Sequence, residues 1–201
     1  MSQEHYFSAS PDSRAALKDI TFRVGERQFA VQAASGTFSA SKLDPGTSIL
    51  LSKFEEFPSE GNVLDLGCGW GPISLAIASF QPGTKVWALD VNTRSLDLAK
   101  SNATKLGLGN IEVVTSEQIP ADLRFDAIWS NPPIRIGKAA LHDLLKTWLP
   151  RLESGGRAML VVQKQLGADS LLAWIQAEFP DLNASRFSTD KGFRILEVTR
   201  D

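Results

Sequence analysis

The segment Asn131-Pro132-Pro133-Ile134 carries residue types that suit the binding of an amine. The side-chain oxygen of Asn131 and the carbonyl of Pro132 are two hydrogen-bond acceptors, and the prolines restrict the backbone between them. An exocyclic amino group has two N–H donors, so this pair of acceptors predicts a site for such a group. The same residues also fit an ordinary turn after the apolar run 125–129, because Asn-Pro and Pro-Pro commonly mark turns.

A glycine-rich turn with the spacing Gly67-x-Gly69-x-Gly71 follows the apolar run Val63–Leu66 and precedes a helical pattern that starts at Ile73. Such a turn, at the carboxyl end of a strand in an open α/β sheet, lets the backbone approach a nucleotide-like ligand. Asp90 ends the next predicted strand, at about the distance where an acidic residue binds ribose hydroxyls. Two plainer interpretations stay open: the turn only connects two elements, and Asp90 only caps the next helix.

The spacing and charge of this turn favour S-adenosylmethionine over a nicotinamide dinucleotide. The dinucleotide motif has the spacing G-x-G-x-x-G, which differs from the spacing here. Asp65 places a carboxylate beside the turn, where it would repel a pyrophosphate and attract the cationic methionine end of S-adenosylmethionine.

Further residues at the same predicted edge, Asn131 among them, are candidates for the cofactor site. Val91 follows Asp90, and Glu117 follows the third predicted strand, where it either accepts a hydrogen bond from the adenine amino group or remains a solvated loop acid. Cys68 belongs to the glycine turn as a lining or packing residue, and Trp70 is expected to pack in the same turn.

These residues are predicted to lie on an α/β core over residues 62–201. Short apolar runs alternate with helical periodicities from Asn62 onward, which predicts a mostly parallel sheet with helices on both faces. Strands are expected at 63–66, 85–90, 111–115, 125–130 and 157–163. Helical stripes follow three of them: one begins near Asn92 or Thr93, one includes Leu141 and Leu152, and one ends before Pro180. With a terminal hairpin formed by 184–188 and 193–199, the sheet should have about seven strands.

Residues 1–61 are predicted to form an amino-terminal extension of this core. The runs 20–24 and 28–32 alternate around Gly25-Glu26, which indicates a β-hairpin. A helix through Ile49 and Phe54 should follow, capped by Thr47 or Ser48. We expect residues 1–201 to form a single domain.

Composition excludes several classes of protein. A chain of 201 residues with 43% hydrophobic and 22% charged residues is typical of a soluble globular domain. No apolar run approaches the roughly 20 residues that span a bilayer, and the start of the chain lacks a secretion signal, so we expect a cytoplasmic protein without membrane contact. One cysteine and two distant histidines do not favour a metal site. The net charge is −2, so binding of RNA would require a local basic patch.

The segment Asp65–Pro72, followed by Asp90 and then by Asn131–Ile134, resembles class I S-adenosylmethionine-dependent methyltransferases. The sequence is most similar to the methyltransferase small family, which includes guanine-N2 methyltransferases of small-subunit ribosomal RNA. It resembles short members of this family that lack an additional amino-terminal domain. Further similar segments are His5–Ser8, Gly36–Ser39, Asp44–Thr47, Ile134–Lys138, Gln163–Ala168 and Lys191–Arg194.

This resemblance implies a Rossmann-like fold, S-adenosylmethionine as the cofactor, and methylation of a nitrogen on a planar group. It also implies that Phe38 and Thr47 close the methionine side of the cofactor pocket, although as residues they fit a core position and a helix cap equally well. The guanine N2 lone pair is delocalised into the ring. Hydrogen bonds from its two N–H groups to Asn131 and Pro132 would favour a pyramidal nitrogen, so that positioning replaces a strong general base.

The family pattern does not identify which residue of this chain stacks on the acceptor base. An aromatic residue often follows the second proline of the motif in amino-methylating enzymes, but here that position is Ile134. Phe193 is a candidate replacement or else a core residue. Ribosomal RNA or a ribosomal particle is the expected partner, and the oligomeric state stays open. Candidate contacts to its phosphates are Arg135, Lys138, Lys164, Lys191 and Arg194.

Three other functions compete with RNA methylation. Protein glutamine methyltransferases share an Asn-Pro-Pro clamp, but they usually carry a helical amino-terminal domain, whereas residues 1–61 have a β pattern. DNA adenine methylation normally requires a dedicated base-reading region, and none is visible. A non-catalytic RNA-binding or protein-binding module would be expected to have lost its glycines or its clamp, and both are intact.

Overall fold

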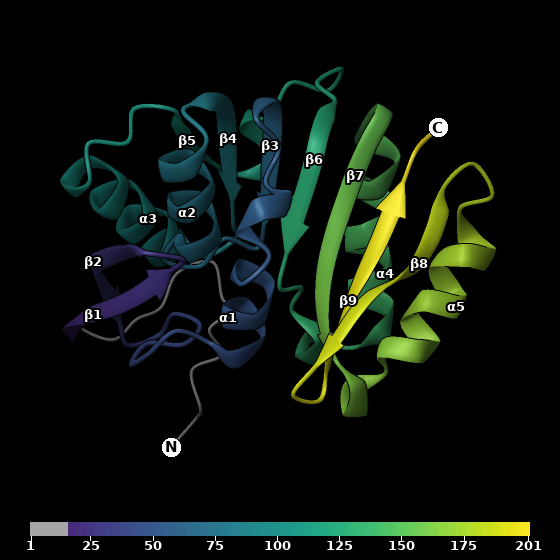
Figure 1. Cartoon of the computed structure of the whole chain (residues 1–201), viewed down its shortest axis with the longest axis horizontal. Helices are drawn as coiled ribbons and strands as arrows, with labels where there is room; N and C mark the ends of the chain where they lie inside the picture. Colours follow the sequence, from purple (N-terminus) through teal and green to yellow (C-terminus); the bar gives the residue numbers. More distant parts are fainter. Residues whose placement is uncertain (1–15) are drawn as a thin grey trace.

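A computed structural model describes residues 16–201, so the segment His5–Ser8 lies outside the described residues. The described part contains one large and one small sheet (Figure 1). The large sheet has seven strands in the order β5-β4-β3-β6-β7-β9-β8. The first five strands of this order are parallel, whereas β9 runs antiparallel to β7 and β8. The predicted α/β class with a mostly parallel seven-stranded sheet is therefore confirmed. The strands are β3 (Glu60–Leu66), β4 (Gly83–Leu89), β5 (Ile111–Val114), β6 (Phe125–Ser130), β7 (Leu152–Gln163), β8 (Asn183–Asp190) and β9 (Phe193–Thr199).

Helices cover both faces of this sheet, as the near-continuous apolar strands require. The helices α1 (Pro45–Leu51), α2 (Pro72–Phe80) and α3 (Thr93–Lys105) contribute to one core cluster. The second cluster lies on the other face and includes α4 (Lys138–Trp148) and α5 (Ala168–Glu178). Within residues 16–201, no helix is both long and apolar enough to cross a membrane.

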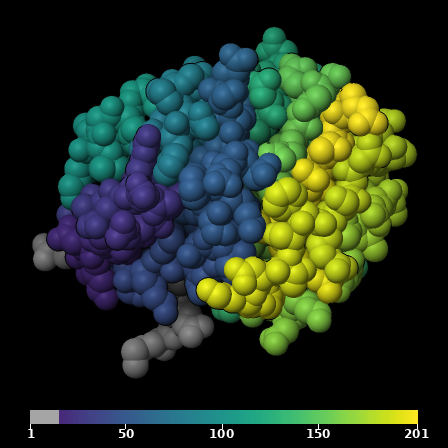
Figure 2. Space-filling model, in the orientation of Figure 1, coloured from purple at the N-terminus to yellow at the C-terminus, as the bar shows by residue number. Residues whose placement is uncertain are grey.

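The small sheet is the predicted amino-terminal hairpin, formed by β1 (Leu17–Val24) and β2 (Arg27–Ala34). Its alternating pattern buries one face against the first core cluster. Asn102 of α3 holds it in place, because its side chain accepts a hydrogen bond from Gln32 N at 2.8 Å and donates one to Gln32 O at 2.8 Å. The hairpin lies at the opposite side of the molecule from the β8–β9 hairpin (Figures 1 and 2).

Three predicted element boundaries are wrong. The helix α1 ends at Leu51, so Phe54 lies outside it, in a separate 3-10 helix (Phe54–Glu56). The helix α1 begins at Pro45 and is capped by Asp44, not by Thr47 or Ser48. Asp is a favourable cap and Pro fits the first helical position, so the helix starts earlier than expected. Leu152 belongs to β7 rather than to the preceding helix, because the chain leaves α4 through a short turn that contains Pro150.

The strand order places a topological switch point between β3 and β6. The chain adds β4 and β5 on one side of β3 and then crosses to add β6 on the other side. Open α/β sheets bind ligands at such a point, beyond the carboxyl ends of the strands. The glycine turn follows β3 and Asn131 follows β6, so the fold brings these two segments to the same crevice.

Candidate active site

A cavity of about 460 Å³ opens beside the glycine turn and Asn131. A smaller cavity of about 20 Å³ adjoins it and shares four lining residues with it, namely Phe38, Asp44, Gly67 and Asn131. The larger volume lies within the usual range for small-molecule sites, roughly 300 to 1,000 Å³.

Exposed apolar side chains gather at this cavity. Four large apolar residues are exposed in the described part of the chain, and three of them, Phe38, Val91 and Leu166, line the larger cavity. Apolar surface that is concentrated at a cavity marks a place where a ligand can cover it.

The glycine turn shapes the smaller cavity. Gly67, Gly69 and Gly71 have φ values of 80°, 57° and 95°, which residues with a side chain rarely adopt. A Cβ added at Gly69 would meet nothing within 4 Å, and Gly69 lines the smaller cavity. The missing side chain therefore leaves space where a ligand can approach the backbone.

Asp90 stands directly after β4 and lines the larger cavity. Its Oδ2 accepts a hydrogen bond from Gly69 N at 2.8 Å, and its Oδ1 accepts one from Asn92 N at 2.9 Å. Burial raises the pKa of this carboxyl. These two bonds fix the carboxylate beside the glycine turn, and each of its oxygens keeps capacity to accept a further hydrogen bond from a ligand hydroxyl.

Asp65 lies behind the turn and lines neither cavity. Its Oδ2 accepts hydrogen bonds from Ser74 N at 2.9 Å and from Ser74 Oγ at 2.5 Å, so the carboxyl binds the first turn of α2. Its Oδ1 is buried and has no hydrogen-bond partner among residues 16–201. Burial raises the pKa of Asp65 to about 7. Any effect of Asp65 on a bound cation therefore acts through its charge and not through direct contact.

The other predicted cofactor residues occupy different parts of the site. Phe38 lines both cavities, whereas Thr47 and Cys68 line the smaller one. Burial raises the pKa of the Cys68 thiol, so it remains protonated at neutral pH. Glu117 is exposed and lines neither cavity, but its neighbour Ser116 lines the larger one and donates a hydrogen bond to Glu117 Oε1 at 2.7 Å.

Asn131 is held by two residues from α1 and its cap. Its Nδ2 donates hydrogen bonds to Asp44 Oδ1 at 2.7 Å and to Thr47 Oγ1 at 3.0 Å. Both N–H groups of the amide are thereby engaged, and the amide oxygen remains as an acceptor. The sequence prediction did not include Asp44, although Asp followed by Pro is a recognisable helix start that could have identified it.

The carbonyl of Pro132 is fixed by a tight turn. Pro133 has φ −75° and ψ 72°, the conformation of an inverse γ-turn, and Ile134 N donates to Pro132 O at 2.8 Å. A carbonyl has two lone pairs, so Pro132 can accept a second hydrogen bond. Asn131, Pro132, Pro133 and Ile134 all line the larger cavity.

Apolar residues from the end of the chain complete the cavity wall. Phe193 starts β9 after the two-residue turn Lys191-Gly192, both of whose residues have positive φ. The ring of Phe193 and the side chain of Leu166 line the larger cavity. Leu166 was missed in the sequence, where a single leucine after a strand carries no distinguishing signal.

Four of the five predicted RNA contacts lie on exposed positions near this edge, and we call them the rim cations: Arg135, Lys138, Lys164 and Lys191. Arg135 lines the larger cavity, and Lys164 N donates to Gly192 O at 2.8 Å, next to Lys191. Arg194 lies apart from them, since it is 8% exposed and forms an ion pair with Asp169 of α5. Successive residues of a strand face opposite sides, so Arg194 points away from the side to which Phe193 points.

A model of the methyltransferase small domain matches residues 28–197. The uncharacterized protein YbxB of Bacillus subtilis (strain 168) is 32% identical over 200 residues, which cover 98% of each chain. Ribosomal RNA small subunit methyltransferase C of Aeromonas hydrophila subsp. hydrophila is 32% identical over 156 residues. These residues make up 75% of this chain and 44% of the relative, so the chain spans about half the length of such relatives.

A solved structure has the same fold. It is that of the T. thermophilus 16S rRNA N2 G1207 methyltransferase (RsmC) in complex with AdoMet and guanosine, with a TM-score of 0.80 and 23% identity. The match covers 95% of this chain and 52% of that chain. The family match, the full-length relative and the shared fold agree with the resemblance of the motifs. The chain therefore belongs to the methyltransferase small family of class I S-adenosylmethionine-dependent methyltransferases.

Proposed function

We propose that the protein transfers a methyl group from S-adenosylmethionine to an exocyclic amino nitrogen of an RNA base, namely guanine N2 of small-subunit ribosomal RNA. The observation that carries this proposal is the bonding of Asn131, whose two amide N–H groups are engaged by Asp44 and Thr47. The acceptor oxygen of the amide is thus left for an amine in the cavity. The functions named for the Aeromonas relative and for the protein of the T. thermophilus structure support ribosomal RNA as the substrate class.

The donor is proposed to bind along the glycine turn, with its methionine end toward the smaller cavity. S-adenosylmethionine supplies an electrophilic methyl group. Asp90 would accept hydrogen bonds from the ribose hydroxyls, and Val91 would cover the adenine ring, since both line the larger cavity. Phe38 and Thr47 would close the methionine side, because both line the smaller cavity.

The acceptor amine is proposed to donate its two N–H groups to Asn131 Oδ1 and Pro132 O. This arrangement aims the nitrogen lone pair at the donor methyl group. A carbon–nitrogen bond then forms while the methyl–sulfur bond breaks, and the nitrogen releases a proton to water. Positioning and stabilisation of the developing positive charge lower the barrier without a strong base.

The acceptor base is proposed to lie between apolar side chains that line the larger cavity, with Ile134 on one side and Leu166 and Phe193 on the other. A base that leaves its stack is usually held in this way. The rim cations would contact phosphates of the RNA. They form the local basic patch that a chain with a net charge of −2 requires to bind RNA. We further propose that residues 1–201 form one domain, since the family match from 28 to 197 covers most of β2 as well as the core, and β1 packs in the same core cluster.

Transfer of a radiolabelled methyl group tests this function. Small ribosomal particles, naked small-subunit RNA and ribosomal protein are offered separately as acceptors. We expect the label in guanosine after nuclease digestion of the RNA. Label in protein alone would replace RNA methylation with side-chain methylation, and binding of S-adenosylmethionine without transfer to any acceptor would contradict an enzymatic role.

Salt dependence tests the rim cations. RNA methylation should weaken by about tenfold to a hundredfold between roughly 50 and 200 mM salt, because phosphate contacts release counterions. Lys164→Glu should weaken it further at low salt. Lys100→Glu, on exposed Lys100 of α3, is the matched control. Equal effects of the two substitutions would show that the rim cations are not the binding surface.

A further inference from the structure

Asn131 and Pro132, whose oxygens are proposed to accept the two N–H groups of the amine, are called the acceptor clamp below. The carboxylate of Asp44 connects the cap of α1 to this clamp. Its Oδ1 accepts a hydrogen bond from Thr47 N at 3.1 Å, which caps α1, and another from Asn131 Nδ2 at 2.7 Å. Asp44 also lines both cavities. One side chain therefore joins the start of α1 to the residue proposed to hold the amine.

The chemistry of this contact determines the orientation of the Asn131 amide. An ionised carboxylate can only accept hydrogen bonds, so it binds the NH₂ side of the amide and repels the oxygen side. The Thr47 hydroxyl accepts the second N–H at 3.0 Å. The amide oxygen and nitrogen are similar in size, so shape alone would select between the two orientations weakly. If the amide were reversed, it would present N–H donors to the N–H donors of the acceptor amine.

We propose that Asp44 is a positioning residue for methyl transfer, which holds the Asn131 amide so that its oxygen faces the acceptor amine. This inference rests on the proposed function, in which Asn131 Oδ1 accepts a hydrogen bond from that amine. Asp44 acts through Asn131 and takes no part in the bonds that form and break.

The packing of α1 supports this role. A Cβ added at Gly46 would lie 3.0 Å from Asp44 Oδ1 and 3.0 Å from Phe193 Cε1, so the glycine leaves room for both the carboxylate and the ring. The segment that contains α1 lies beside the β8–β9 hairpin on the surface shown in Figure 2. The first turn of α1 thus packs against two parts of the proposed acceptor site.

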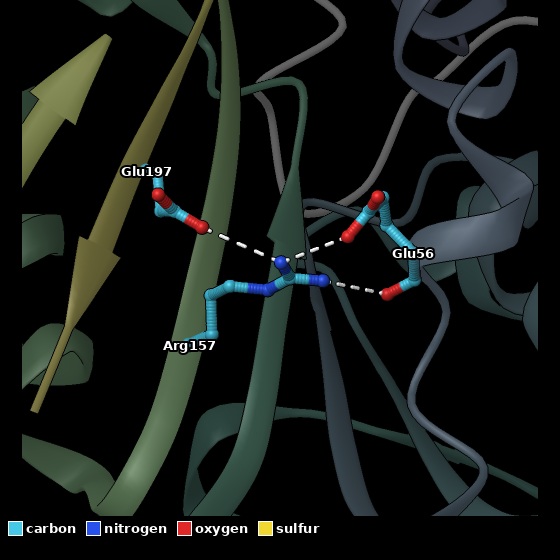
Figure 3. Close-up of polar contacts among 3 residues, drawn as sticks. All are labelled: Glu56, Arg157 and Glu197. Atoms are coloured by element: carbon cyan, nitrogen blue, oxygen red, sulfur yellow. Dashed lines mark hydrogen bonds and ion pairs between the residues drawn. The ribbon is translucent and has the colours of Figure 1, made fainter. Parts of the chain in front are cut away.

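A salt bridge tethers the chain beyond the other end of α1. Arg157 of β7 binds the Glu56 carboxylate at 3.0 Å and the Glu56 carbonyl at 2.8 Å, and it also lies 3.4 Å from Glu197 of β9 (Figure 3). The helix is therefore attached to the sheet near both of its ends, which suits an element that must hold Asn131 in one orientation.

Two substitutions of Asp44 separate positioning from other roles. Ser in Asp44→Ser still caps α1 but is too short to reach Asn131, whereas Asn in Asp44→Asn supplies an acceptor oxygen of the same length for both contacts. We expect Asp44→Ser to lower kcat by about tenfold to a hundredfold, because misplaced catalytic groups have effects of this size. Its Kd for S-adenosylmethionine, measured by calorimetry, should stay within about threefold of wild type. Asp44→Asn should restore most of kcat.

Three outcomes would overturn the inference. A wild-type kcat in Asp44→Ser would show that the contact is dispensable. Weakened binding of S-adenosylmethionine in both variants would show that the charge of Asp44 binds the donor directly. A lowered midpoint of thermal unfolding in Asp44→Ser, together with proportional losses of kcat and donor affinity, would show that its role is structural.

Asn131→Ala, measured in the same assay, separates this inference from the proposed function. If Asn131→Ala leaves kcat unchanged, the clamp itself is wrong and the proposed function fails. If Asn131→Ala loses activity but Asp44→Ser does not, the clamp stands and only the role of Asp44 fails.

Discussion

The two halves of the site are built in different ways. In the donor half, the glycine turn and Asp90 stand at the ends of neighbouring strands, and the hydrogen bond that joins Gly69 to Asp90 spans 21 residues of sequence. In the acceptor half, the bond between Asn131 and Asp44 spans 87 residues, and Phe193 comes from the last hairpin. We infer that the donor half depends mainly on strand ends and backbone, with Thr47 as its one contribution from α1, whereas the acceptor half depends on how α1 and β9 pack against the sheet.

This difference predicts that the two halves can be impaired separately. A change in the clamp should lower the rate of transfer and spare donor affinity. A change in the glycine turn should lower the affinity for the donor and spare the rate of transfer.

Asn131→Ala should have the largest effect. We expect kcat to fall by about a hundredfold to a thousandfold, as when a preorganised hydrogen-bonding group is removed from an active site. The Kd for S-adenosylmethionine, measured by calorimetry, should change by less than about threefold, because the change removes an interaction made to the acceptor. The control is Asn183→Ala, since Asn183 is exposed and bonds to Asp201 at the end of the chain. Equal losses of kcat and donor affinity would show that the halves are not independent.

Gly69→Ala should impair the donor half. The residue has φ 57°, which costs a side-chain-bearing residue about 1–2 kcal/mol, and its new methyl group would enter the space beside the smaller cavity. We expect the Kd for S-adenosylmethionine to rise about tenfold while kcat at saturating donor stays near wild type. Gly107→Ala is the control, because Gly107 has φ 67°, open space around it and no place in either cavity. A similar rise in Kd in both variants would attribute the effect to lost stability.

Asp65, which lies behind the donor half, should make the free energy of unfolding of the protein depend on pH. Its pKa is raised from 3.8 to about 7 by burial, so between these pH values the folded state binds more protons than the unfolded state. The free energy of unfolding should therefore decrease as pH rises from about 4 to about 7 and then level off. Asp65→Asn should flatten this dependence, which is measured by urea unfolding at several pH values. An unchanged pH dependence would show that other groups, such as Asp90, cause it.

Arg157→Met should have the smallest effect. Its side chain is 29% exposed and its ion pair with Glu56 is partly screened, so we expect a loss of about 1 kcal/mol in the free energy of unfolding, or a few degrees in the unfolding midpoint. If the position of α1 affects the orientation of Asn131, kcat should fall by about twofold to threefold with donor affinity unchanged. The control is Lys146→Met, which removes a surface ion pair with Glu178. It should leave the free energy of unfolding and kcat unchanged. A loss of donor affinity in Arg157→Met would contradict the separation of the halves.

Much of the fold could be predicted because its signals are local. The apolar runs and helical stripes from Asn62 onward predicted the succession of strands and helices along the chain, and a parallel sheet brings the carboxyl ends of its strands to one edge. The positions of the Gly67-x-Gly69-x-Gly71 turn, Asp90 and Asn131–Ile134 at strand ends therefore predict a common crevice. Their order in the chain was sufficient to indicate the family.

Contacts between distant segments could not be predicted in this way. Nothing in the sequence near Asn131 indicates that Asp44 engages its amide, because the two residues meet only after α1 packs against the sheet. The burial of Asp65 and the pairing of Arg194 with Asp169 depend on which helix covers each face of a strand. The elements and the residue types at their ends thus follow from local patterns in the sequence. Which side chains face the cavity depends on the folded arrangement, because packing between elements sets their orientation.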